Sequence, residues 1–424
     1  MNKYGRKFIS CLFVLILFST PLGAQEIREG EILTLERCLE LALRNNPSIV
    51  GARANLRLYE TKINQAKANY YPQVTWDTQY SRVGPYSDNL SQYNSYATNI
   101  GLSQNIFDFQ RTPLKVEIAK INTQSVARDL ENIETEVANT VKQAFYSLLQ
   151  AQKNKGVAEE TFKNFDLHLK QAKGFYEAGT KPRIDVIKAE VDLSNARLNL
   201  IQAENAVRLA RIALNNAMGI KDTPAYNISE ELKIPIKLMP LSEAIREAYN
   251  NRHDLNSLRL KKEAANKSLL LAKKNYFPTV TGNAAYGFEG NEFPLGRGWQ
   301  VGASVSIPIF SGFLTRYQVE EAKFNYDVIT SQIENLENDI RRDVEQAYSN
   351  LIEAKDRINA AEKTLKYAKE NADLATGRYN VGIGSPIEVT DALVALANAQ
   401  TSYISALVDF KKAEAALEKA MGKK

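Results

Sequence analysis

Residues 69–74 read Asn-Tyr-Tyr-Pro-Gln-Val and residues 275–280 read Asn-Tyr-Phe-Pro-Thr-Val, so one short motif occurs twice, 275 − 69 = 206 positions apart. Before each proline the apolar residues have the spacing of a helix, and after it apolar and polar residues alternate. Each motif therefore marks a junction between a helix and a strand. Since a fixed period in a sequence indicates a repeated structural unit, we expect two copies of one larger unit.

The two copies extend over almost the whole chain. After the strands, matching segments recur at a slightly shorter offset, as 309 − 106 = 203 for two Ile-Phe pairs. The matches are Ile106-Phe107 with Ile309-Phe310, Val141–Phe145 with Val344–Tyr348, Tyr176 and Gly179 with Tyr379 and Gly382, and Ala217–Gly219 with Ala420–Gly422. We predict a signal peptide at 1–24, a first repeat at 25–219, a proline-containing linker at 220–240 and a second repeat at 241–424.

Long helices are predicted by apolar residues that recur every seven positions, with a second apolar set four positions later. The first series is Val137, Ala144, Ala151, Ala158, Phe165 and Ala172, and its copy is Ile340, Ala347, Ala354, Ala361, Ala368 and Ala375. From Arg111 to Tyr176 no strong helix breaker follows Pro113. One helix of about 100 Å is therefore expected at 1.5 Å per residue. Such heptads alone are equally compatible with a filament-type coiled coil.

The alternating segments predict two β-hairpins, at 72–107 and 278–310. Their apolar positions are Val74, Trp76, Tyr80, Tyr96, Ile100, Leu102 and Ile106 in the first, and Val280, Ala284, Tyr286, Phe288, Trp299, Val301, Ala303, Val305, Ile307 and Ile309 in the second. Strands of about ten residues with this alternation are typical of transmembrane β-barrels. A half-buried sheet on a soluble domain has the same alternation and remains the alternative.

Four strands are too few to close a membrane barrel, since the smallest barrels have about eight. An open sheet edge in lipid is very costly. If the barrel interpretation holds, several copies of the chain must share one barrel. We therefore predict a mostly helical α+β fold. It contains long coiled-coil hairpins, and each chain adds four transmembrane strands to a shared β-barrel.

The N-terminus predicts export from the cytoplasm. Lys3, Arg6 and Lys7 precede a mainly apolar run at 8–18, and small residues follow up to Ala24. This order is typical of a secretory signal peptide, with cleavage expected after Ala24. The apolar run is shorter than the roughly 20 residues that a transmembrane helix requires.

Composition excludes several classes of protein. The 54 basic and 49 acidic residues give a formal charge of +5, too small to indicate nucleic-acid binding. Two cysteines cannot form a disulfide scaffold, and we expect Cys38 to be a small buried residue. His168 and His253 share no metal-ligand spacing, and Gly382-Ile-Gly384 lacks the third glycine of a phosphate loop. We expect neither catalysis nor a cofactor nor a bound metal.

In its expected mature part, the chain resembles the TolC family of outer-membrane efflux proteins over nearly the whole length. The matching motifs are Leu35–Ala42 with Asn45–Pro47, the junctions Tyr71-Pro72 and Phe277-Pro278, the strand ends Ser103–Phe107 and Ser306–Gly312, the turns Tyr176–Gly179 and Tyr379–Gly382, and the two Met-Gly ends. The resemblance implies a homotrimer with a twelve-stranded β-barrel in the outer membrane. It also implies that the long helical hairpins form an α-barrel, a tunnel across the periplasm, with an equatorial belt near 220–240. It also implies export of drugs, metals or proteins, and docking to a periplasmic adaptor and an inner-membrane RND, ABC or MFS pump.

The resemblance also points to an acidic entrance. Glu388 and Asp391 match positions where family members carry acidic rings at the periplasmic end. They are three residues apart near the start of a helix and therefore share one face. Three copies around an axis would form two anionic rings that favour cations. The alternative is that these acids only complement the positive end of the helix dipole.

A second set of positions matches the polar links that hold the family's tip closed. Asp185 and Tyr379 correspond to two partners, and the helical turns are expected at Gly179 and Gly382. Where the family has a basic residue, this chain has Gly384, which is a departure from the pattern. Three basic residues near the first turn are candidates to replace it, namely Lys181, Arg183 and Lys188. The alternative is that the latch is weaker in this chain.

Two other kinds of protein also contain helical hairpins. A periplasmic adaptor has one hairpin flanked by other domains, whereas this chain has two full copies with alternating strands. A structural coiled-coil protein without a pore explains the heptads but not the strands. Both remain alternatives at this stage.

Overall fold

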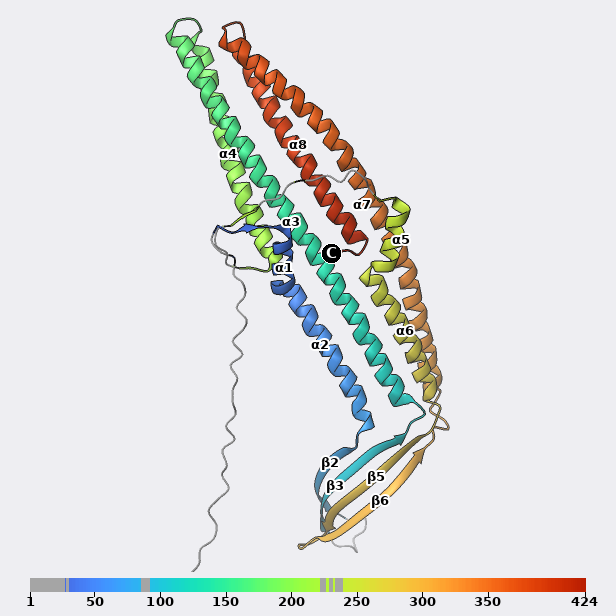
Figure 1. Ribbon diagram of the computed structural model, residues 1–424. Coiled ribbons are helices and arrows are strands. Elements are labelled where there is room, and N and C mark those ends of the chain that lie inside the picture. Colours follow the sequence, from blue (N-terminus) through green and yellow to red (C-terminus); the bar gives the residue numbers. More distant parts are fainter. Residues whose placement is uncertain (1–26, 28–29, 85–91, 222–225, 229–231, 233–238) are drawn as a thin grey trace, which may run out of the picture.

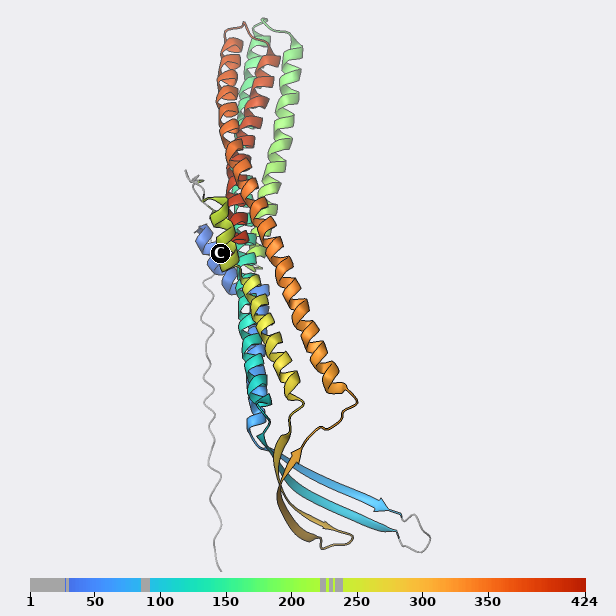
Figure 2. The same cartoon turned by 90° about the vertical axis from the view of Figure 1, so that its right-hand side faces the viewer.

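The structure is a computed structural model that describes residues 27, 30–84, 92–221, 226–228, 232 and 239–424. The expected signal peptide and most of the expected linker lie outside the described residues. The molecule is elongated, with two helical hairpins side by side at one end and a sheet at the other (Figure 1). In the perpendicular view the sheet turns away from the direction of the helices (Figure 2).

The first repeat contains α1 (Leu35–Asn45), α2 (Pro47–Lys67), the 3₁₀ helix η1 (Ala68–Tyr70), β2 (Gln73–Val83), β3 (Tyr93–Phe107), α3 (Arg111–Glu177) and α4 (Arg183–Met218). The second contains α5 (Leu241–Asn251), α6 (His253–Lys274), β5 (Thr279–Gly290), β6 (Gly296–Ser306), α7 (Leu314–Asn380) and α8 (Pro386–Ala420). Two short strands, β1 (Ile32–Leu33) and β4 (Asn227–Ile228), pair in parallel. No helix within the described residues is long and apolar enough to cross a membrane.

The elements of the two repeats match at the offsets found in the sequence. Helices α3 and α7 each have 67 residues, and both of their ends are separated by 314 − 111 = 380 − 177 = 203 positions. At 1.5 Å per residue each helix is about 100 Å long, which confirms the long helix expected from Arg111 to Tyr176. The hairpins also share one register, because Gln73 pairs with Ser103 and Thr279 with Ser306.

The two hairpins form one antiparallel sheet in the order β2-β3-β5-β6, so β2 and β6 are its edges. Pairing of β3 with β5 joins the repeats and places Ile100 opposite Tyr286. One face of the sheet carries the apolar residues of all four strands, including the exposed Trp76 and Trp299. The other face carries mainly Ser, Thr, Asn, Gln and Gly. This confirms the alternation expected from the sequence.

Two strand boundaries differ from the expected ones. Strand β6 ends at Ser306, whereas the second hairpin was expected to reach residue 310. Pro308 has no backbone N–H, so the ladder of hydrogen bonds cannot continue through it, and Ile309 is fully exposed outside the strand. Strand β3 has 15 residues rather than about ten and contains a bulge between Asn105 and Phe107.

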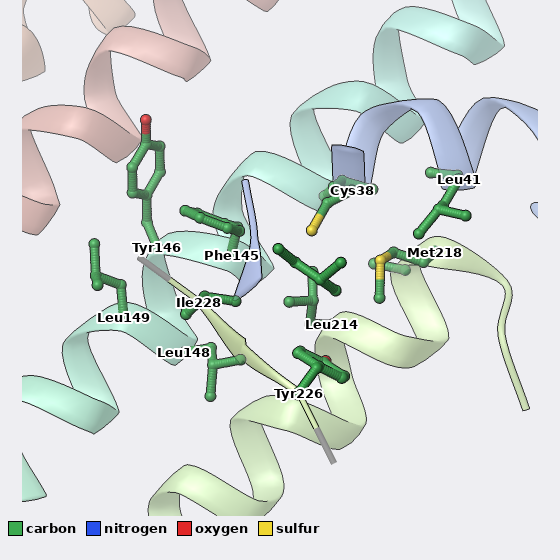
Figure 3. Close-up of a cluster of buried hydrophobic side chains, with 14 of the residues drawn as sticks. Cys38, Leu41, Phe145, Tyr146, Leu148, Leu149, Leu214, Met218, Tyr226 and Ile228 are labelled. Carbon is green, nitrogen blue, oxygen red and sulfur yellow. The ribbon is translucent and has the colours of Figure 1, made fainter. Parts of the chain in front are cut away.

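The core consists mainly of two hubs near the middle of the molecule. The first hub is formed by apolar residues of α1, α3 and α4, and Figure 3 shows Cys38, Phe145 and Leu214 pointing toward one another. Cys38 is buried as expected, and burial raises the pKa of its thiol to about 12. The second hub surrounds Ile340 and Phe410 in the second repeat. Toward the tips the buried clusters consist mostly of alanine.

The repeated Met-Gly ends have a packing role. Gly219 and Gly422 have φ angles of 73° and 75°, in the left-handed region that favours glycine. A Cβ at Gly219 would lie 2.7 Å from the carbonyl oxygen of Asn45, and one at Gly422 would lie 2.9 Å from the backbone of Arg252. Each glycine therefore lets the end of α4 or α8 rest directly on the junction between the two short helices of its repeat.

Candidate functional site at the helical tips

The two long hairpins end in turns of the same kind. Residues 178–182 connect α3 to α4, and residues 381–385 connect α7 to α8. Gly179 and Gly382 lie just beyond the long helices with φ angles of 71° and 83°. These left-handed residues let backbone N–H groups close the helix ends, as in the bond from Thr180 N to Phe175 O at 2.9 Å. Both expected turns are therefore present, and Figure 1 shows them at the same end of the molecule.

Tyr379, the last but one residue of α7, is buried between the two hairpins. Its ring centroid lies 4.9 Å from that of His168 and 5.5 Å from that of Phe175, both on α3. The side chain is 0% exposed, and its hydroxyl has no hydrogen-bond partner among the described residues. Tyr379 therefore contributes to the contact between the two hairpins by ring packing. The expected polar latch did not predict this kind of contact.

Asp185 lies in the first turn of α4 and is half-buried. Burial raises the pKa of Tyr379, and the negative charge of Asp185 raises it further. The two latch candidates are thus close enough to interact electrostatically, but no hydrogen bond joins them. Asp192, two turns further along α4, accepts a hydrogen bond from Thr390 of α8 at 2.8 Å. This second link between the hairpins was not expected from the sequence.

Lys181 connects the two turns directly. Its Nζ donates to the carbonyl oxygen of Gly384 at 3.4 Å and lies 5.8 Å above the ring of Tyr379. A Cβ at Gly384 would be only 2.8 Å from the backbone nitrogen of Tyr379, so a larger residue does not fit there without a shift. Lys181 is one of the three basic residues expected as replacements, and within the chain its side chain reaches the other turn.

His168 was missed as a site residue because the sequence shows only its place beside a heptad position. Its side chain is buried, and its Nδ1 has no hydrogen-bond partner among the described residues. Burial lowers the pKa of His168, while Asp192 and Asp185 act in the opposite direction. The imidazole lines a cavity of about 650 Å³ between α3, α7 and α8.

Glu388 and Asp391 lie in the first two turns of α8, as expected. Ser385 caps this helix by accepting a hydrogen bond from the N–H of Ile387 at 3.2 Å. Both carboxylates are exposed, and Glu388 lies 3.6 Å from Arg378 of α7. Asp391 makes no polar contact with another described residue. The two acids therefore differ, because only Asp391 presents a charge without a cationic neighbour.

Among the residues that the structure describes, no group of three or more His, Cys, Asp and Glu side chains could hold a metal ion.

Comparisons with known proteins agree with this architecture. A family model described as "Outer membrane efflux protein" matches residues 38–220 and 244–423, one stretch in each repeat. The outer membrane protein TolC of Escherichia coli is 23% identical over 419 residues, covering 94% of this chain and 84% of the relative. The outer membrane efflux protein BepC of Brucella suis is 24% identical, covering 92% and 85%. A crystal structure of CusC superposes with a TM-score of 0.79 at 18% identity, covering 95% and 96%.

Proposed function

The chain belongs to the outer membrane efflux protein family, and from this premise we propose that it forms, as a homotrimer, the outer-membrane channel of an efflux system. Three copies contribute four strands each to one twelve-stranded barrel in the outer membrane. Their helices form one tunnel across the periplasm. The cargo is a drug, another toxic small molecule or a protein, which passes from the periplasm to the exterior.

One observation carries the shared barrel: a sheet with one apolar face and two open edges at the end of helices about 100 Å long. The number of three copies follows from membership of the family. Apolar residues cover one face of all four strands, including large exposed side chains such as Trp76, Trp299 and Val301. In water this face is a large exposed apolar patch, and in lipid it is matched to its surroundings. The edges β2 and β6 then require strands from other copies, because unpaired backbone groups in lipid are very costly.

The opposite end of the molecule is the proposed entrance. Asp391 and Glu388 form anionic rings there when three copies surround one axis, and such rings attract cations. Lys181, Tyr379 and Asp185 hold the two hairpins of each chain together and keep the entrance narrow. A periplasmic adaptor and an inner-membrane RND, ABC or MFS pump dock at this end, and the pump supplies the energy for export.

The proposal is tested by expressing the full chain in a Gram-negative host. We expect it in the outer-membrane fraction as a heat-resistant trimer on SDS gels, and we expect purified protein to form pores in planar bilayers. A protein found only in the soluble periplasmic fraction, or one that is monomeric and forms no pores, would contradict the channel. It would favour the adaptor or structural coiled-coil alternative.

A further inference from the structure

Three phenylalanine rings form a ladder where the sheet meets the helices (Figure 1). Phe107, at the end of β3, pairs with Val280 of β5. Because paired residues of neighbouring strands point to the same side of a sheet, Phe107 lies on the apolar face. Its ring centroid is 4.7 Å from that of Phe109, which is 5.3 Å from that of Phe277. This phenylalanine ladder therefore extends the apolar face from the sheet toward the end of α6.

Two cations lie at the helical end of the ladder, and both contact Phe277. Arg111, the first residue of α3, donates from Nη2 to the carbonyl oxygen of Phe277 at 2.6 Å and from Nε to that of Lys274 at 3.0 Å. Lys274 is the last residue of α6, and its Nζ lies over the Phe277 ring, 5.2 Å from the centroid. The two carbonyl bonds fix the guanidinium, while its Nη1 makes no hydrogen bond with another described residue.

The charge at this end of the ladder is positive. Neither Arg111 nor Lys274 forms an ion pair with a carboxylate among the described residues. Asp108 is close to them in the sequence, but it is buried. Its carboxylate accepts hydrogen bonds from the backbone N–H of Thr112 at 2.8 Å and from Nδ2 of Asn105 at 2.9 Å. Two partly exposed cations therefore stand against one buried carboxylate, which has its own hydrogen-bond donors.

The middle ring of the ladder is held in a strained backbone conformation. Phe109 has a φ angle of 51°, in the left-handed region that residues with bulky side chains rarely adopt. Its equivalent in the second repeat, at 109 + 203 = 312, is Gly312, which has a φ angle of 62° and no side chain. The first repeat thus keeps an aromatic ring where the backbone favours glycine. Strain of this kind points to a function for the side chain.

The positions equivalent to the two cations carry no charge. Arg111 corresponds to Leu314, because 111 + 203 = 314, and Lys274 corresponds to Ala68, because 274 − 206 = 68. The strained ring and both cations are therefore present together, and all three are replaced together at the equivalent positions. A requirement of every junction between helix and strand would appear in both copies, so this combination serves something specific to the place where α3 and α6 meet the sheet.

We infer that the phenylalanine ladder and its two cations bind an anionic phospholipid of the membrane, with the phosphate group at Arg111 and Lys274 and an acyl chain along the rings. The inference rests on the proposed position of the sheet in the outer membrane and adds the class of lipid that this place recognises. Guanidinium and ammonium groups are the usual partners of phosphate. A zwitterionic headgroup carries its own cation and gains less from the pair.

The order of the groups along the ladder matches the order of groups in such a lipid. Phe107 lies on the apolar face of the sheet and is 52% exposed, and Phe277 beside the cations is 42% exposed. Aromatic side chains are enriched at the boundary between hydrocarbon and headgroups. The ladder therefore crosses this boundary, with its apolar end toward the acyl chains and its charged end at the level of the phosphates.

Native mass spectrometry of the full-length protein in detergent tests the lipid. The purified trimer is titrated with phosphatidylglycerol or with phosphatidylcholine of the same acyl chains, and the unmodified protein should prefer phosphatidylglycerol by about fivefold for each cation. Lys274→Gln should therefore weaken binding of phosphatidylglycerol by about fivefold and leave phosphatidylcholine binding unchanged. Lys363→Gln is the matched control, because it removes the same charge from an exposed position of α7 far from the sheet.

Two further variants test the other parts of the site. Arg111→Gln should act like Lys274→Gln, but it also removes two bonds to the backbone, so Lys274→Gln remains decisive if Arg111→Gln does not fold. Phe109→Gly introduces the residue of the equivalent position, Gly312, which has the same backbone conformation. It should weaken binding of both lipids, because the ring that contacts the acyl chain is lost.

Equal affinity of the unmodified trimer for the two lipids overturns the inference and leaves the proposed channel intact. An equal loss in Lys274→Gln and Lys363→Gln also overturns it, because the response would then be to overall charge. Displacement of bound phosphatidylglycerol by inorganic phosphate alone would show an anion site rather than a lipid site, with the same consequence. If the unmodified protein forms no trimer in the outer-membrane fraction, the proposed channel is overturned, and this inference with it.

Discussion

Helices α3 and α7 have the same length and the same heptad pattern but different surroundings. Helix α3 packs against α1, α2 and α4 of its own repeat and against α6 and α8 of the other. Helix α7 packs mainly against α5, α6 and α8 of its own repeat, and it contacts α3 at the tip through Tyr379. The heptad therefore specifies a helix with two long packing faces, and the place of the helix in the chain decides how many of them are filled.

The tips differ in a related way. Tyr379 is buried against α3, whereas its equivalent in the first turn, Tyr176, is 46% exposed. Lys181 reaches the backbone of the other turn, whereas its equivalent is Gly384, which has no side chain to reach out. At the tip, the two hairpins of one chain are thus held together by the packing of Tyr379 and by a charge-assisted hydrogen bond from Lys181. The second repeat has no equivalent donor, because Gly384 has no side chain.

The largest predicted effect comes from comparing a buried residue of α3, Leu149, with its more exposed equivalent on α7, Ile352. Leu149→Ala removes a fully buried side chain and should lower the free energy of unfolding by about 2–5 kcal/mol. Both the unfolding temperature of the helices and the dissociation temperature of the trimer should therefore fall. Ile352→Ala should lower mainly the dissociation temperature, because Ile352 is 40% exposed in the single chain and would gain its contacts in the proposed trimer. Circular dichroism and SDS-gel thermal titration measure the two quantities. Equal effects of Ile352→Ala on both would contradict the distinction.

The Met-Gly ends should behave alike in both repeats. Gly219→Ala and Gly422→Ala each place a Cβ in a left-handed residue against a neighbouring backbone. A strained residue of this kind costs of the order of 1–3 kcal/mol, so both variants should lower the unfolding temperature by a similar amount. Gly156→Ala on α3 is a suitable control, since no atom lies near a Cβ there. A large effect in only one repeat would show that the two junctions are not equivalent.

Loss of the link between the turns should widen the entrance. Lys181→Met removes a hydrogen bond of about 0.5–1.5 kcal/mol while keeping a long side chain, and it should raise single-channel conductance in planar bilayers. Asp185→Ala should act in the same direction, because it removes the other proposed latch residue of the first turn of α4. Arg183→Met, an exposed change in the same turn, should leave conductance as it was. Unchanged conductance in both Lys181→Met and Asp185→Ala would argue against a latch.

A smaller effect is predicted for substitution of the two acidic residues of α8, Asp391 and Glu388. Asp391→Ala should weaken block of the channel by divalent cations added from the periplasmic side, because an unpaired exposed charge is removed. Glu388→Gln should have a lesser effect, since Glu388 already has Arg378 as a neighbour. Current recordings at several cation concentrations give the block constants. If block is unaltered by Asp391→Ala, the acids only complement the helix dipole.

The smallest predicted effect is a response to pH. Burial lowers the pKa of His168 in the folded protein, so the unfolded or opened seam binds its proton more readily once the pH falls below about 6.5. The contact between the two hairpins around His168 is therefore fully stable above that pH, and its stability decreases as the pH falls below it. The charged groups near the imidazole are Asp185, Lys188 and Asp192 of α4. The ring of Tyr379 on α7 packs against it.

His168→Gln tests this response. It should reduce the difference in trimer melting temperature between pH 7.5 and pH 5 relative to the unmodified protein. The comparison between the two proteins at each pH separates His168 from other groups that titrate in the same range, such as His253. An identical pH difference in both proteins would exclude His168 as its source.

Much of the fold could be predicted from the sequence because its periods are long. Heptads from Val137 to Ala172 and from Ile340 to Ala375, together with the alternation in the strands, predicted the elements clearly. The repeat supported each prediction a second time. The end of β6 was wrong because Ile307 and Ile309 continue the apolar alternation, while Pro308 between them cannot join the ladder. There a backbone property outweighed a side-chain pattern.

The candidate site was less predictable because its contacts join residues far apart in the chain. Tyr379 was named from the family pattern, but its ring contacts with His168 and Phe175 depend on how two hairpins pack together. Lys181 was one of three candidate bases, and only the approach of the two turns selects it. Helical periodicity predicts the side of a helix on which each residue lies, but it does not predict which residue of the other hairpin that side contacts.

The length of the helices gives the first hub a mechanical role. From Val141 in that hub to Glu177 at the end of α3 there are 177 − 141 = 36 residues, a lever arm of about 54 Å at 1.5 Å per residue. A tilt of about 5° around the hub moves the tip by about 5 Å at this rise. In the proposed channel, the hub would stay packed while the width of the entrance changes, and the links between the turns would oppose that change.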